Sequence, residues 1–253
     1  MEEGEHRLDG QIPGEARSAG SAWARLPRMF YEPGSVFREL RQHPSWVPPL
    51  LLAMLMTLAT QLVVVPHIDL DASVRQALAQ RSSSAQMTEQ QIDRAVEISR
   101  KMARISVFLS PLVVPLILLL IAGIYYLGLR SVTSEVEYKP VFSTLLHAAV
   151  PAVVVSSVLM MAVVVQKGTV IQEQATRLVK SNLGALLPAS APKVAQAAAS
   201  VVDVFNIWQA VLLVLGFEIV LRVSRRRAVT VVAVVWGVWM LARVGWAALQ
   251  SAM

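Results

Sequence analysis

Long runs of apolar residues alternate with short polar segments along almost the whole chain. The cleanest run, residues 105–129, contains no charged side chain. A helix needs about 20 apolar residues to cross the hydrocarbon core of a bilayer. The pattern therefore predicts an all-α polytopic membrane protein, a bundle of five transmembrane helices at residues 46–65, 105–129, 141–165, 202–223 and 228–249.

Three of the polar segments show helical periodicity and predict short amphipathic helices, the first and third of them on the membrane surface. The first follows the Pro33-Gly34 turn and places Val36, Phe37 and Leu40 on one side. The second begins at a capping-box pattern, Thr88 to Gln91, and leads into the second span. The third covers residues 171–187 and ends at Pro188.

The ends of the chain suggest a simple domain organisation. Residues 1–27 are polar and rich in Gly, Ala and Arg, and they lack the apolar residues that a core requires. We expect them to form a disordered cytoplasmic tail. Residues 28–250 then make one membrane domain.

Composition agrees with a membrane protein and excludes some chemistry. Hydrophobic residues make up 55% of the chain and charged residues 16%, whereas soluble domains carry about 25% charged residues. The chain has no cysteine, which excludes disulfides and thiolate-bound metals. The net charge of +6 comes from basic residues beside the apolar runs. It therefore predicts contact with anionic lipid headgroups, and no nucleic-acid partner is expected.

The distribution of Lys and Arg predicts the orientation of the chain. Cytoplasmic loops of membrane proteins carry an excess of these residues. This rule favours an N-terminus in the cytoplasm and, with five spans, a C-terminus outside. Its strongest element is a basic cytoplasmic hairpin between the last two spans, made of Arg222, Arg225, Arg226 and Arg227.

Three short motifs have the order and spacing of one known family. They are Glu32-Pro33-Gly34-x-x-Phe37-Arg38-Glu39-Leu40 before the first span, Phe142-x-x-x-Leu146-x-Ala148 in the third, and Asp203-x-Phe205-x-x-Trp208 at the start of the fourth. Over residues 30–248 the chain resembles the bacterial branch of the Yip domain family of Ypt/Rab-interacting membrane proteins.

The resemblance implies five spans, a cytoplasmic N-terminus, no catalytic centre and a place in the bacterial cytoplasmic membrane. Eukaryotic members of the family bind lipid-modified small GTPases in vesicle traffic. This chain lacks the Asp-Leu-Tyr-Gly-Pro type motif of those relatives.

Four of the ionisable residues within the predicted spans are candidate functional groups. Asp203 and Arg243 lie at similar depth in neighbouring antiparallel spans, which predicts an ion pair between them. Glu218 is one turn from Arg222, which predicts a second pair. Glu218 also lies at the depth of His147, and the two are interpreted either as a proton-sensitive site or as packing with interfacial solvation.

Enzyme signatures such as His-Glu-x-x-His, Gly-x-Ser-x-Gly and phosphate-binding loops are absent from the sequence. We therefore expect no enzyme, cofactor or metal. The expected role is membrane organisation or scaffolding of a protein partner. A second copy of the chain is an alternative partner, through glycines in the spans.

A permease-like component for a small solute or ion is the alternative function. A permease predicts a polar cavity between helices, whereas a scaffold predicts a dry bundle. Three tryptophans of the fifth span fit either a lipid-facing surface or a groove: Trp236, Trp239 and Trp246.

Overall fold

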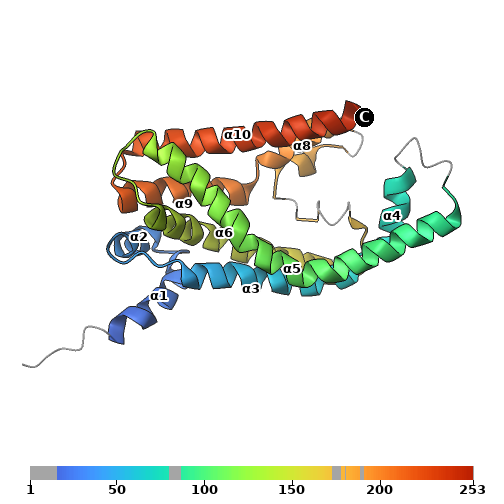
Figure 1. The fold of residues 1–253 in the computed structure, drawn as a ribbon, viewed down its shortest axis with the longest axis horizontal. Helices are drawn as coiled ribbons and strands as arrows, with labels where there is room; N and C mark the ends of the chain where they lie inside the picture. The colour runs from blue at the N-terminus through green and yellow to red at the C-terminus, as the bar shows by residue number, and fades with distance from the viewer. Residues whose placement is uncertain (1–15, 80–86, 173–177, 180, 189–190, 253) are drawn as a thin grey trace, which may run out of the picture.

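A computed structural model of the chain describes residues 16–79, 87–172, 178–179, 181–188 and 191–252 (Figure 1). These residues are helical and contain no β-strand, only two isolated bridges. The α-helices are α1 Ala16–Arg28, α2 Pro33–Gln42, α3 Val47–Val64, α4 Leu70–Ala79, α5 Glu89–Arg130, α6 Tyr138–Lys167, α8 Lys193–Val201, α9 Val204–Leu221 and α10 Arg225–Ala252. Two short 3-10 helices are η1 Val65–His67 and η3 Leu183–Leu186.

Five of these helices, α3, α5, α6, α9 and α10, are long and apolar enough to cross a membrane. The predicted all-α fold with five spans is therefore confirmed. The links 131–137 and 222–224 lie at one end of the bundle, next to α1 and α2, and we call this the hairpin end (Figure 1, left). Helix α4 and the C-terminus of α10 lie at the other end, which we call the far end.

Helix α5 continues without interruption from a polar segment into the membrane span. Its first turn has the predicted capping box, in which Thr88 N donates to Gln91 Oε1 at 2.9 Å. Pro111 and Pro115 lie in its middle, and Figure 1 shows the helix curving along its length. Each proline removes a backbone donor, which accounts for the curvature.

The N-terminal segment departs from the prediction. Residues 16–28 form helix α1, so the expectation of a disordered tail over residues 1–27 is wrong for the part from residue 16. Residues 1–15 lie outside the described residues. Leu26 and Met29 are buried against the rest of the protein, and this tertiary burial supplies a stabilisation that the local composition does not.

Helix α2 departs from its predicted position on the membrane surface. Val36, Phe37 and Leu40 do lie on one side of it, but all three are 0% exposed and belong to the main core. The helix packs against α9 and α6. The amphipathic pattern was therefore interpreted correctly as a helix with one buried face, but protein rather than lipid covers that face.

The third predicted surface helix, residues 171–187, is wrong for the described residues from 178 on, whereas Gln172 is helical. Leu183–Leu186 form a short 3-10 helix, and Asn182 pairs with Asp203 in an isolated bridge. Residues 173–177 and 180 of this prediction lie outside the described residues. The bridge ties the segment to the start of α9, which a free interfacial helix would not allow.

Candidate functional site: two joined cavities between the helices

Asp203 is the N-cap of α9 rather than half of an ion pair. Its Oδ1 accepts from Phe205 N at 2.8 Å and from Asn206 N at 3.4 Å. Its Oδ2 accepts from the Ser181 hydroxyl. The carboxylate thus satisfies donors at the helix start that would otherwise have no partner.

Arg243 lies over the face of Trp239, with its guanidinium carbon 5.0 Å from the ring centre. The predicted ion pair with Asp203 is not formed, because capping and Ser181 already occupy the Asp203 oxygens. Within the described part of the chain, no carboxylate lies within salt-bridge distance of Arg243. Among the described residues, the guanidinium therefore has an aromatic contact and no ion pair.

Both residues nevertheless line one cavity of about 510 Å³ at the far-end half of the bundle. The walls come from α3, α6, α9 and α10 and from the segment that precedes α8. Many of the lining groups are hydroxyls and amides, namely Thr60, Ser156, Ser157, Ser181, Asn182 and Asn206. The sequence analysis placed Asp203 and Arg243 together correctly but missed the hydroxyl groups, which come from other helices.

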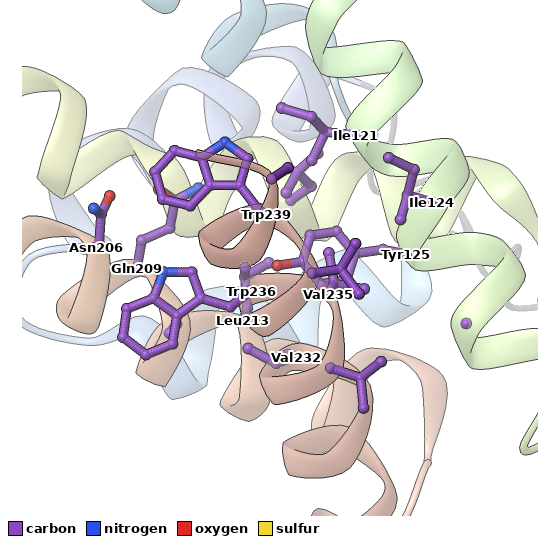
Figure 2. A pocket seen from close by; sticks show the side chains of 16 residues that line it. Ile121, Ile124, Tyr125, Asn206, Gln209, Leu213, Val232, Val235, Trp236 and Trp239 are labelled. Atoms are coloured by element: carbon purple, nitrogen blue, oxygen red, sulfur yellow. The ribbon is translucent and has the colours of Figure 1, made fainter. Parts of the chain in front are cut away.

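A second cavity, of about 700 Å³, lies between α5, α9 and α10. Figure 2 shows Trp236 and Trp239 of α10 on the side of Asn206 and Gln209, with Ile121 and Tyr125 of α5 across the cavity. Its walls are mainly apolar side chains. Trp236 and Trp239 line this cavity and Trp246 does not, and Trp239 is 42% and Trp246 63% exposed on the surface of the bundle.

The two cavities are neighbours, because Asn206 and Trp239 line both. Arg243 lies five turns from the start of α10, or about 27 Å at 1.5 Å per residue. An upright helix that begins at one face of a hydrocarbon core about 30 Å thick would carry Arg243 close to the opposite face. The apolar cavity extends from there toward the hairpin end, as far as Gly128.

Glu218 and His147 do not form the predicted site. Glu218 Oε2 is 3.9 Å from Arg225 Nε. Arg222 is the C-cap of α9 and adopts a left-handed backbone conformation, with φ 54°. Its side chain therefore does not have the helical i, i+4 position that a pair with Glu218 requires. The predicted Glu218–Arg222 pair is therefore replaced by a longer contact across the hairpin.

His147 is completely buried within α6, where its Nδ1 lies 2.9 Å from the Ser143 carbonyl oxygen. Its Nε2 has no hydrogen-bond partner in the described residues. The nitrogen that faces a carbonyl must carry the proton, which leaves Nε2 as a buried acceptor. The packing interpretation fits His147 better than a pair with Glu218.

The basic hairpin is open to its surroundings. Arg222, Arg225, Arg226 and Arg227 are all exposed at the hairpin end. Apart from the Arg225–Glu218 contact, no salt bridge in the described residues involves them. They form a positive surface beside the end of α9.

A cluster of charges that the sequence analysis missed fixes α1 to α2. Arg25 is 4% exposed, and it donates to Glu39 Oε2 at 3.1 Å, to the His43 carbonyl and to Ser45 Oγ. Arg28 donates to Glu39 Oε1 at 2.7 Å. Burial by itself would raise the pKa of the Glu39 carboxyl, but the hydrogen bonds from Arg28 and Arg25 outweigh burial and lower the pKa.

The residues of the family-like motifs have structural roles. Pro33 is at the start of α2, where its missing N–H costs nothing. The Phe142 ring lies 6.1 Å from that of Tyr138, and Trp208 meets Phe30 edge-on at 6.2 Å. These contacts join the N-terminal segment to α9 and close the start of α6.

Five apolar membrane-length helices packed around one core define an integral membrane protein of the helical-bundle class. The sequence model of the Yip1 domain matches residues 28–247, which is most of the chain. The chain therefore belongs to the Yip1 domain family, a non-enzymatic family of membrane proteins. No curated protein and no solved structure matches the chain.

Proposed function

We propose that this protein is a non-catalytic scaffold of the bacterial cytoplasmic membrane, with its hairpin end and N-terminus in the cytoplasm. A protein partner or a second copy of the chain docks at the hairpin end, beside anionic headgroups. Membrane organisation follows from holding that partner at the bilayer. No nucleic acid and no cofactor takes part.

The observation that supports this proposal is the packed core at the hairpin end. Phe37, Leu145 and Phe217 are buried there, and Tyr125 packs on Phe217 with ring centres 5.5 Å apart. This core fills the space where α2, α6 and α9 meet, and the neighbouring cavity that continues past it toward Gly128 has mainly apolar walls. A hydrated ion or small polar solute would lose hydrogen bonds to water in such a space, which is costly.

The exposed arginines support the docking side of the proposal. Four cations at one surface attract anionic headgroups and acidic protein surfaces. The side chains of Arg226 and Arg227 are exposed and form no salt bridge in the described part of the chain. Their charge is thus free for an external partner.

Photo-crosslinking in living cells tests the proposal. A photoreactive side chain is placed at Arg226, on the hairpin end, and for comparison at Leu186, on the far end and 80% exposed. We expect a discrete protein adduct from position 226 that disappears when Arg225 and Arg227 are changed to Gln. An adduct whose yield is unchanged when Arg225 and Arg227 are changed to Gln would contradict docking at this surface.

The permease-like role is the second candidate, favoured by the polar cavity itself. Purified protein in liposomes separates the two functions. We expect K⁺, proton and phosphate flux equal to that of empty vesicles. Flux that disappears in the Arg243→Gln variant would support the permease and overturn the scaffold.

A further inference from the structure

We propose that the two neighbouring cavities hold one anionic phospholipid, with its phosphate at Arg243 and an acyl chain in the apolar cavity between α5, α9 and α10. This inference goes beyond the proposed scaffold role and does not depend on it. It assigns a ligand class to the far-end half of the bundle, away from the basic hairpin.

Charge is the first argument. Arg243 is a cation that contacts the Trp239 ring and, among the described residues, forms no salt bridge, although the Asp203 carboxylate lines the same cavity. A guanidinium binds a phosphate through two parallel hydrogen bonds. The Ser156, Ser157 and Asn206 side chains in the same cavity add polar groups for the rest of a headgroup.

Asp203 does not oppose an anion as much as its charge suggests. Its oxygens accept from two backbone N–H groups at the start of α9 and from Ser181. These donors, with the positive end of the α9 dipole, offset the carboxylate charge. The unmatched charge in the cavity is therefore that of Arg243.

The volume and the apolar walls of the second cavity are the second argument. Its volume of about 700 Å³ lies within the range of ordinary small-molecule sites, about 300–1,000 Å³. Water is excluded from an apolar space that offers it too few hydrogen bonds. Since hydrocarbon surrounds this part of the bundle, an acyl chain is the occupant available there.

An unpaired donor is the third argument. Trp236 lines the apolar cavity, and its Nε1 is buried without a hydrogen-bond partner in the described residues. A buried indole N–H normally finds an acceptor. A phospholipid supplies one in the ester carbonyl, which lies between its phosphate and its chains. Figure 2 shows the Trp236 ring on the same side of the cavity as Asn206 and Gln209.

Native mass spectrometry of the full chain in mild detergent tests the proposal. The probes are phosphatidylglycerol, phosphatidylcholine with the same acyl chains, and inorganic phosphate. We expect one retained phosphatidylglycerol per chain. Arg243→Gln should weaken its retention by about tenfold or more, as loss of a charge-assisted hydrogen bond predicts. Arg94→Gln, which removes an exposed arginine of α5 that lines neither cavity, is the matched control and should retain the lipid.

Three results would overturn the proposal: equal retention of the two phospholipids, equal retention by wild type and the Arg243→Gln variant, or binding of inorganic phosphate in place of the lipid. The position of the acyl chain is tested by a separate measurement. Phosphatidylglycerol with brominated acyl chains should quench tryptophan fluorescence of the wild type, and Trp236→Phe should lose much of this quenching. Unchanged quenching in that variant would show that the acyl chain does not lie in the apolar cavity beside Trp236.

Discussion

Single residues determine how closely the helices approach. Gly216 on α9 faces Thr144 of α6 and Phe37 of α2. A Cβ at this position would lie 2.4 Å from Thr144 Cγ2 and 2.9 Å from Phe37 Cε1. No heavy-atom contact is stable at such distances, so only glycine lets α2, α6 and α9 meet here.

We predict that Gly216→Ala destabilises the bundle by about 1–3 kcal/mol, the usual cost of overpacking a core. The control is Gly237→Ala on α10, where an added Cβ meets nothing within 4 Å. It should be neutral or slightly stabilising, since alanine favours helix. Thermal unfolding in detergent, followed by circular dichroism, measures both. Equal effects of the two substitutions would contradict the packing at Gly216.

The Glu39 carboxylate gives the N-terminal segment a pH dependence. Its pKa in the folded protein is lower than the ordinary 4.5. A lowered pKa stabilises the folded state above the unfolded-state pKa, and this stabilisation is lost as the pH falls through the folded-state value. Contacts of Glu39 with Arg25 and Arg28 should therefore weaken only in acid.

The corresponding prediction compares wild type with Glu39→Gln. Wild type should be more stable than Glu39→Gln above about pH 4.5, the ordinary glutamate pKa, and the difference should shrink in more acidic buffer. Unfolding temperatures measured from pH 7 to pH 3 provide the test. Glu135→Gln, exposed in the link 131–137, serves as the control. A constant difference across this range would show that the arginines do not act through the Glu39 charge.

Asp203 shows why a residue's partner is harder to predict than its depth. Helical rise along two spans correctly brought Asp203 and Arg243 to one level. The competing donors, Phe205 N and Ser181 Oγ, lie closer to the carboxylate. Ser181 reaches the carboxylate only because the segment before α8 folds back onto the start of α9. No periodic pattern in the sequence predicts this fold.

Among the elements, α4 and the first turns of α5 form a hairpin outside the apolar part of the bundle. Arg100 pairs with Asp71, and Arg75 Nη1 lies 3.2 Å from Glu89 Oε2. All four side chains are about half exposed or more. Exposed ion pairs of this kind contribute little to the free energy of unfolding, and salt screens them.

We therefore predict that Asp71→Asn changes global stability by less than about 0.5 kcal/mol. Hydrogen exchange of the α4 amides should nevertheless accelerate, because the pair holds α4 to α5. The effect on exchange should decrease at high salt. A global destabilisation well above this value would show that α4 is part of the cooperative core.

Helix α2 illustrates the limit of pattern analysis at the scale of elements. Its apolar face is visible in the sequence, since Val36, Phe37 and Leu40 recur at helical spacing. The same spacing suits a helix on lipid and a helix on protein. Docking on α9 depends on Gly216, which is far away in the sequence, and on the buried Arg25 that ties α1 to α2.

The whole molecule has two chemically different ends. The hairpin end carries the basic hairpin and the packed N-terminal helices, and the far end carries the polar cavity. The hairpin end and the far end face opposite sides of the membrane, and an odd number of spans also places the N- and C-terminal ends of the membrane domain on opposite sides. The proposed orientation can therefore be tested with labels on the connecting segments.

The absence of cysteine from the sequence makes that test direct. We predict that Ser134→Cys and Ser224→Cys, both exposed at the hairpin end, react with a membrane-impermeant maleimide only after cells are opened. Thr169→Cys, exposed at the far end, should react in intact cells. The reverse labelling pattern would invert the orientation and move the proposed docking surface outside.

The sequence by itself determined that the chain crosses a membrane with five helices and that it belongs to the Yip1 domain family. Hydrophobic length and helical period are local properties, so they can be read from consecutive residues. Only the tertiary structure decided that α2 is buried, that Asp203 caps α9 instead of pairing with Arg243, and that two cavities meet at Asn206 and Trp239. These features depend on distances between helices, and close packing of distant side chains sets those distances.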